Sequence, residues 1–146
     1  MTRAVCGFYF SNDKGRFVLI KKNRPKWQHG LLNGVGGKVE EGEFALDAMR
    51  REFREETGVD VEDWDPYCVV VDEVHRYEVT YFRAFCPDRN LDRCKTMTDE
   101  EVHNFPVGAV FTLPVVHNLT WLVPMALDSN VSSTRSVWRD NSPQQE

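Results

Sequence analysis

The chain has 146 residues, of which 41% are hydrophobic, 12% aromatic and 28% charged, and its formal net charge at pH 7 is −5. This length and composition are typical of one globular domain with a core of its own, and they exclude a disordered chain. The negative net charge argues against general nucleic-acid binding, which depends on cationic side chains that neutralise phosphates.

The sequence shows no segment for a membrane or for export. No apolar run reaches the roughly 20 residues that a spanning helix needs, and Met1–Phe10 lacks the apolar core and cleavage site of a signal peptide. We therefore expect a cytoplasmic protein without a membrane partner. We also expect reduced, mostly buried thiols, because no Cys-x-x-Cys spacing indicates a zinc or redox site. The four cysteines are Cys6, Cys68, Cys86 and Cys94.

The first quarter of the chain predicts a hairpin followed by a loop. Val5–Phe10 and Arg16–Lys22 are rich in β-branched and aromatic residues, and turn residues separate them. The next segment, Asn23–Gly37, holds four glycines after a proline. We expect this segment to be an ordered functional loop without regular secondary structure.

Helical periodicity follows over Glu43–Thr57, and Gly58 stands where a left-handed glycine ends a helix. On a helical wheel, three glutamates fall within an arc of about 100°. They are Glu52, Glu55 and Glu56. A separate apolar stripe predicts packing on a sheet; it consists of Leu46, Met49 and Phe53. The carboxylates of these three glutamates repel one another, so the stripe is either a cation site or an acidic face neutralised by nearby arginines.

The second half of the chain alternates strands and loops before a last helix. Tyr67–Glu73 and Tyr77–Cys86 read as strands, Asp88–Asp99 as a polar loop and Val102–Val107 as a short strand. Asn118–Asp128 predicts a helix that Pro124 shortens or kinks. Because the sequence turns polar beyond Ser129, we expect a domain over residues 1–128 and a loosely held tail over residues 129–146.

One spaced pattern covers residues 37 to 59. It runs Gly37, five residues, Glu43, seven residues, Arg51-Glu52-Phe53, one residue, Glu55-Glu56, one residue, Gly58-Val59. The pattern resembles the Nudix box, with every specified position filled. The resemblance implies an α/β (α+β) class Nudix fold, in which a mixed sheet is sandwiched between helices and the box forms a loop, a helix and a second loop.

The resemblance also implies a metal-dependent pyrophosphohydrolase. Its metal, Mg²⁺ or Mn²⁺, would be held by oxygen ligands, which suit a hard cation. These ligands are the carbonyl of Gly36 and the side chains of Glu52, Glu55 and Glu56, with Glu100 as an outer ligand. The metal would neutralise phosphate charge and activate water. Glu52, Glu100 or Glu101 could accept the proton; we favour Glu100, because the segment from Asp99 to Val107 resembles the loop and strand that supply this ligand in MutT-like members. Glu55 is a further catalytic candidate.

The remaining candidates surround the box. Glu43 and Arg51 are expected to form an ion pair behind the metal carboxylates. Lys38 is a candidate for the substrate's phosphates, as are Lys22, Arg24 and Lys26, although exposed lysines are often only solvated.

The substrate is expected to be a small nucleotide. Leu32–Lys38 resembles the segment of relatives that hydrolyse oxidised purine nucleoside triphosphates, in which an asparagine at the position of Asn33 contacts the purine. Asn118 stands where those relatives place an aspartate for the base edge, and an amide offers both a donor and an acceptor. A (d)NTP or oxidised purine triphosphate is thus the first hypothesis.

Other possibilities stay open at this point. A dinucleoside polyphosphate or ADP-ribose hydrolase is one alternative, and Tyr77 lies where a tyrosine marks some dinucleoside polyphosphate relatives. A nucleotide-sensing module without activity is another, although a sensor has no need of a complete glutamate stripe. Four aromatic residues could stack on a base or belong to the core: Phe8, Trp27, Phe105 and Trp121. The sequence does not decide between a monomer and a homodimer.

Overall fold

The structure is a computed structural model that describes residues 1–140. Within these residues, one mixed sheet has the strand order β3-β2-β1-β6-β5-β8, while β4 pairs with β1 and β7 pairs with β2. The strands are β1 (Thr2–Ser11), β2 (Arg16–Lys21), β3 (Leu32–Asn33), β4 (Val35–Lys38), β5 (Asp65–Asp72), β6 (Tyr77–Cys86), β7 (Val102–Pro106) and β8 (Thr134–Trp138). The helices are α1 (Ala45–Thr57), α2 (Asp88–Asp92) and α3 (Leu119–Leu127), with short 3₁₀ helices η1 (Lys26–Gln28) and η2 (Val107–Phe111).

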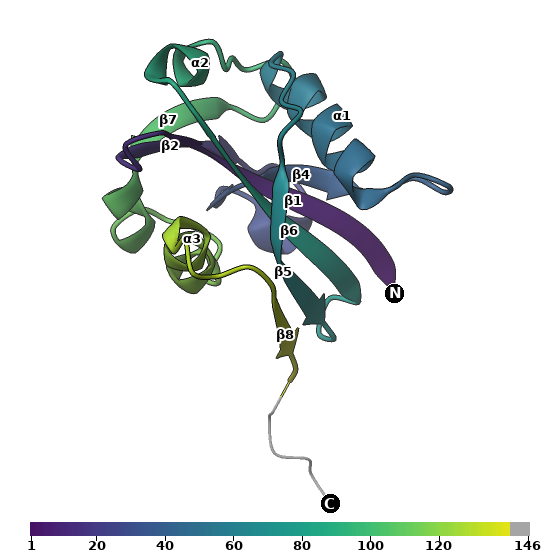
Figure 1. Ribbon diagram of the computed structural model, residues 1–146. Helices are drawn as coiled ribbons and strands as arrows, with labels where there is room; N and C mark the ends of the chain where they lie inside the picture. The colour runs from purple at the N-terminus through teal and green to yellow at the C-terminus, as the bar shows by residue number, and fades with distance from the viewer. Residues whose placement is uncertain (141–146) are drawn as a thin grey trace, which may run out of the picture.

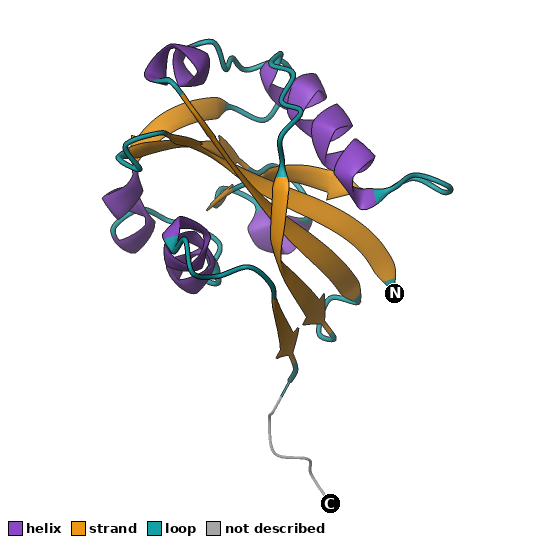
Figure 2. Ribbon diagram, in the orientation of Figure 1, coloured by secondary structure: helices purple, strands orange, loops and turns teal. Residues whose placement is uncertain are grey.

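The central strand β1 divides the core into two layers. Because side chains alternate along a strand, Phe8 and Phe10 face one side and pack with Leu122 of α3. Tyr9 faces the other side, where its ring lies 5.2 Å from that of Phe53 on α1. The two helices therefore cover opposite faces of the sheet (Figures 1 and 2). The predicted mixed sheet between helices is confirmed.

Helix α1 ends as its sequence predicts, since Gly58 adopts a left-handed φ of 78° and its N–H bonds to the carbonyl of Arg54. Met49 and Phe53 are fully buried, but Leu46 is 46% exposed. The prediction of Leu46 as a core residue is wrong, because the small Ala48 takes the buried place beside Met49. Helix α1 lies beside β4 (Figure 1).

Two expected loops contain regular structure. Within Asn23–Gly37, the residues of β3 pair with β2, and those of β4 pair with β1. The prediction of a loop is wrong there, because glycine lets two backbones meet: a Cβ on Gly36 would lie 1.9 Å from the carbonyl oxygen of Val5. The polar segment Asp88–Asp99 likewise begins with the short helix α2.

The last strand requires a further correction. β8 pairs in parallel with β5, and its terminal Trp138 lies opposite Asp72. The expectation of a loosely held segment is wrong for Thr134–Trp138, because backbone hydrogen bonds to the sheet edge fix this strand. Residues 141–146 of the expected tail lie outside the described residues, and the boundary at residue 128 stays a prediction. The helix expected near Asn118–Asp128 is present as α3. Over residues 1–140, no helix has the length and apolarity to cross a membrane.

Candidate functional site

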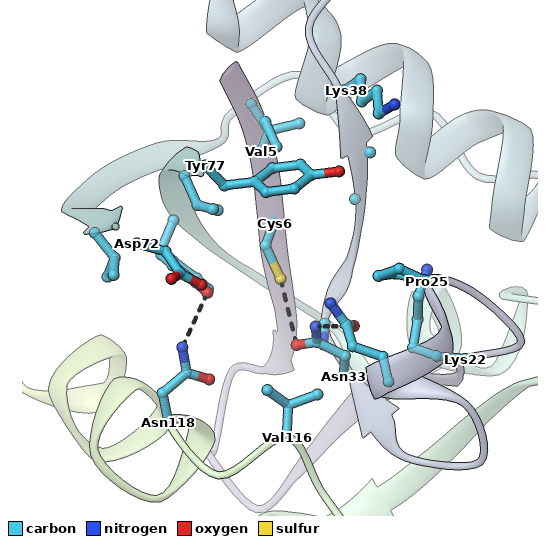
Figure 3. Close-up of a pocket in the computed structure, with 18 of the residues that line it drawn as sticks. Val5, Cys6, Lys22, Pro25, Asn33, Lys38, Asp72, Tyr77, Val116 and Asn118 are labelled. Atoms are coloured by element: carbon cyan, nitrogen blue, oxygen red, sulfur yellow. Dashed lines mark hydrogen bonds between the residues drawn. The ribbon is translucent and has the colours of Figure 1, made fainter. Parts of the chain in front are cut away.

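A pocket of about 330 Å³ is lined by residues of β1, β4, β5 and β6, by Glu56 of α1 and by Asn118 at the start of α3. Figure 3 shows its two ends: Lys38 lies near α1, whereas Asn118 and Val116 lie at the opposite end, beside α3. The end near α1, which we call the box end, is lined by Gly36, Gly37, Lys38, Glu56 and Glu100, with Lys22 and Arg24. The other end, which we call the base end, is lined by Gln28, Asn33, Asp72, Tyr81, Asn118 and Trp138, with Trp27.

Glu52 occupies the contact between α1 and β4. A Cβ built on Gly37 would lie 2.5 Å from the Glu52 carboxylate, so only glycine leaves room for this side chain. Burial raises the pKa of Glu52, and a 2.8 Å hydrogen bond from Arg51 opposes that shift. The box glycine and the first box glutamate therefore form one packed unit.

Arg51 forms hydrogen bonds to several parts of the box. Its Nε and Nη2 donate to the two carboxylate oxygens of Glu43, both at 2.9 Å, and Nη2 also donates to the carbonyl of Lys38 at 3.1 Å. The Arg51 guanidinium lowers the pKa of Glu43 to about 2. The expected ion pair between Glu43 and Arg51 is present, and it ties the loop before α1 to the strand β4.

Of the two remaining box glutamates, Glu55 is exposed and Glu56 is partly buried. Glu55 accepts a 3.4 Å hydrogen bond from Arg51, and Glu56 accepts one of 2.8 Å from Thr98. Across residues 1–140, no three acidic, histidine or cysteine side chains converge into a ready cation site. The donors nevertheless suit Mg²⁺ in chemistry, since hard carboxylate oxygens share one face of α1. Each of these two carboxylates uses only Oε2 in its hydrogen bond, so Oε1 is available to an ion.

Glu100 approaches the same end from the loop before β7. It is only 3% exposed, and its carboxylate accepts a 2.9 Å hydrogen bond from Lys22 and backbone N–H groups of Asn23 and Arg24. A buried carboxylate needs such partners. Glu100 therefore lines the pocket beside the box as a compensated charge, and its predicted catalytic role stays a prediction.

Both predicted asparagines line the base end. Asn33 is satisfied within the protein: its Oδ1 accepts the N–H of Gly34 at 2.8 Å, and its Nδ2 donates to Gln28 at 3.0 Å. Asn118 is 5% exposed and donates from Nδ2 to the Tyr81 hydroxyl at 3.3 Å. Its Oδ1 is buried and has no hydrogen-bond partner. Asn118 is therefore a lining residue that has one buried, unpaired acceptor.

The family model described as the NUDIX domain matches residues 1–120. The chain belongs to the Nudix family. This confirms the resemblance carried by residues 37 to 59, and it supports a Nudix pyrophosphohydrolase.

Solved Nudix structures have the same fold. One such structure comes from a study of MutT from Aliivibrio salmonicida and Vibrio cholerae. It is 20% identical to this chain, with a TM-score of 0.70, and the match covers 86% of this chain and 96% of that one. MutT from Bacillus halodurans is 20% identical, with a TM-score of 0.69 and coverage of 90% and 86%. The NUDIX domain of NrtR from Shewanella oneidensis, in complex with ADP ribose, is 16% identical, with a TM-score of 0.72 and coverage of 85% and 84%. At these identities the likeness shows the Nudix fold.

Several pocket residues of this Nudix chain were not predicted from its sequence. Asp72 is buried at the end of β5, where Oδ1 accepts the N–H groups of Val74 and His75 and Oδ2 lies 2.9 Å from His75 Nδ1. Trp138 reaches the pocket from β8, beyond the matched residues 1–120. The available signals were a polar residue at the end of the apolar strand β5 and a tryptophan inside the polar C-terminal segment.

The aromatic candidates divide between the core and the pocket. Phe8 is fully buried in the core, and Phe105 packs against the same cluster. Trp27 lines the pocket, as does Tyr77, whereas Trp121 is not among the lining residues. Of the basic candidates, Lys22, Arg24 and Lys38 line the pocket, and Lys26 does not.

Proposed function

We propose that this Nudix protein hydrolyses a diphosphate linkage of a nucleoside triphosphate, with a normal or oxidised purine triphosphate as the preferred substrate. The observation that carries the proposal is the continuity of one pocket, which joins the box end to the base end. Phosphates at Gly37 and Lys38 would place the nucleoside toward Asn33 and Asn118 (Figure 3). We further propose that it acts in the cytoplasm on free nucleotides, as a monomer or a homodimer.

Mg²⁺ or Mn²⁺ would be held by box residues and Glu100. The proposed ligands are the carbonyl of Gly36 and the side chains of Glu52, Glu55, Glu56 and Glu100. When bound, such an ion neutralises phosphate charge and lowers the pKa of a bound water. The chain's own part is to hold the carboxylates in place, which Arg51 does through Glu43 and the carbonyl of Lys38.

The proton acceptor we propose is Glu100. It lines the pocket, whereas Glu52 is held against Gly37 and Arg51. Its hydrogen bond from Lys22 orients the carboxylate, and Lys22 lines the same end of the pocket, where its ammonium group could meet a substrate phosphate. Lys38 and Arg24 are the proposed phosphate contacts beside it.

At the base end, the unpaired Oδ1 of Asn118 supports a base that presents an N–H donor. A buried acceptor without a partner costs about 1–3 kcal/mol, and a ligand that donates to it recovers that loss. Asp72 is a second buried acceptor in the same wall. A nucleobase with adjacent N–H groups fits this arrangement better than a sugar alone.

An ADP-ribose or dinucleoside polyphosphate hydrolase is the second candidate. It is favoured by Tyr77 in the pocket lining and by the structural likeness to an NrtR domain that binds ADP ribose. A pure sensor is less consistent with the chain, because all three box glutamates are present.

The test is a Mg²⁺-dependent screen of nucleoside triphosphates, oxidised purine triphosphates, ADP-ribose, other nucleotide sugars, dinucleoside polyphosphates and capped RNA, with products identified by mass. Release of a nucleoside monophosphate and pyrophosphate from a purine triphosphate is the expected result. Turnover of ADP-ribose or dinucleoside polyphosphates alone would contradict the proposed substrate and favour the second candidate. Tight binding without turnover of any compound would favour the sensor.

A further inference from the structure

Four aromatic rings from distant segments meet at the base end. Trp27 comes from η1, His75 from the β5–β6 turn, His117 from the loop before α3 and Trp138 from β8. Trp27 stacks on His75 with centroids 4.2 Å apart and an interplanar angle of 14°. Trp138 meets His117 edge to face at 4.5 Å and lies 5.2 Å from His75 and 6.2 Å from Trp27. Both tryptophans line the pocket.

The backbone and Asp72 hold this cluster without any ligand. The parallel register places Trp138 opposite Asp72, and the N–H of Glu73 donates to the Trp138 carbonyl at 2.8 Å. Asp72 in turn holds His75 through its ring nitrogen and its backbone N–H. Because His75 supports one face of Trp27, the positions of both tryptophans depend on the same short segment. The rings are therefore preorganised.

The tryptophans keep part of their surface outside the core, although Trp138 also packs against the core cluster that contains Leu122. Trp27 is 37% exposed, and neither tryptophan belongs to the fully buried residues. Flat, partly exposed indole rings beside buried acceptors are the usual surroundings of a stacked heteroaromatic base, because the ring faces supply apolar contact and the acceptors fix the base edge. The acceptors here are Asp72 and Asn118 Oδ1.

We propose that β8 is part of the substrate site and that Trp138 forms the stacking wall for a nucleobase, with Trp27, whose ring is inclined by 71° to it, bordering the same base, and that this arrangement selects bicyclic purines over pyrimidines. The inference rests on the proposed nucleotide activity and extends it to a segment outside the family match, which ends at residue 120. Larger rings bury more surface against the two indoles, so the purine preference follows from contact area.

The variant that tests this is Trp138→Leu, which keeps apolar volume near β5 but removes the aromatic face. Trp138→Phe is the conservative partner, and Val137→Ala on the same strand is the matched control, since Val137 is 45% exposed and does not line the pocket. KM and kcat are measured with a purine triphosphate, a pyrimidine triphosphate and inorganic tripolyphosphate, and melting temperatures show whether each variant is folded.

Loss of one stacking partner is worth roughly a 10-fold change in affinity. We expect Trp138→Leu to raise KM for the purine substrate about 10-fold, the pyrimidine KM less and the tripolyphosphate KM not at all. Trp138→Phe should recover most of the purine affinity, and Val137→Ala should match the wild type. Equal losses with all three compounds, or an unchanged purine KM in a folded Trp138→Leu variant, would overturn the inference.

A binding measurement separates this inference from the proposed activity. Guanosine, adenosine and cytidine 5′-monophosphates are titrated calorimetrically into wild type and Trp138→Leu in the presence of EDTA, so that no turnover occurs. Purine-selective binding that Trp138→Leu weakens supports the stacking wall, even if no triphosphate is hydrolysed. Wild-type hydrolysis of nucleotides with identical binding by both proteins would reject the stacking wall and leave the proposed activity intact.

Discussion

The two ends of the pocket are built in opposite ways. At the box end, three of the carboxylates lie on one helix, and a single arginine holds Glu43, Glu52 and the carbonyl of Lys38. At the base end, the lining residues come from η1, β3, β5, β6, the start of α3 and β8. Chemistry at the box end depends on charge and local spacing, whereas selectivity at the base end depends on tertiary packing. Substitutions at the two ends should therefore change different kinetic constants.

The largest expected effect is at the box end. Glu55→Gln should lower kcat roughly 100-fold or more with little change in KM, because it removes one proposed metal carboxylate. The Glu55 side chain is 55% exposed and accepts only a 3.4 Å bond from Arg51, so the melting temperature should stay unchanged. The matched control is Glu62→Gln, whose side chain is 75% exposed and pairs with Arg50 instead. A Glu55→Gln variant with wild-type turnover would contradict the proposed metal-binding role of the box.

The next effect should appear in Arg51→Lys. Lysine keeps the positive charge but lacks the planar fork that donates to both oxygens of Glu43. We expect kcat to fall about 10-fold to 100-fold, because the carboxylates lose their common support. Kinetics at several Mg²⁺ concentrations measure this effect. If extra Mg²⁺ restores most of the rate, Arg51 acts by positioning the metal carboxylates; an unchanged kcat at every concentration would contradict that role.

The base end should respond through KM. Asn118→Leu removes the unused acceptor and should raise the KM of a purine triphosphate roughly 10-fold, while kcat changes little. Tyr81→Phe is the control, because it removes only the hydroxyl that Asn118 donates to. A purine KM that is the same for Asn118→Leu and wild type would place the base elsewhere in the pocket.

The smallest effect concerns stability and pH. The pKa of Glu43 is lowered from 4.5 to about 2 by Arg51, so the folded state favours the ionised carboxylate. This stabilisation is fully present above pH 4.5 and is lost as the pH falls toward 2. Glu43→Gln should therefore lower the free energy of unfolding by about 1 kcal/mol at pH 6 and much less near pH 2. Urea denaturation at both pH values measures the difference, and an equal loss at both would show that the ion pair is not its source.

The sequence predicted most of the box end because its parts are close in the chain. The spacing of Glu52, Glu55 and Glu56 and the left-handed Gly58 follow from the geometry of one helix, and the ion pair of Glu43 with Arg51 follows from the box. The exposed Leu46 was missed, since periodicity finds a stripe but not which of its members a sheet covers.

Much of the base end could not be predicted, because its residues meet only through strand pairing. Asn33 and Asn118 were found by resemblance, and the structure places both in the pocket. Trp138 lies in a polar segment that pairs with β5, and β5 is too far away in the chain for local sequence patterns to predict this pairing. Asp72 looks like an ordinary strand end in the sequence, and its role in holding His75 appears only in three dimensions.

The division of the pocket is tested most directly by steady-state kinetics of Glu55→Gln and Asn118→Leu on the same purine triphosphate at saturating Mg²⁺. The account predicts that Glu55→Gln lowers kcat and leaves KM nearly unchanged. It predicts that Asn118→Leu raises KM and leaves kcat nearly unchanged. An equal fall of kcat in both variants, or a rise in KM alone in Glu55→Gln, would contradict the separation of a chemical end from a base-binding end.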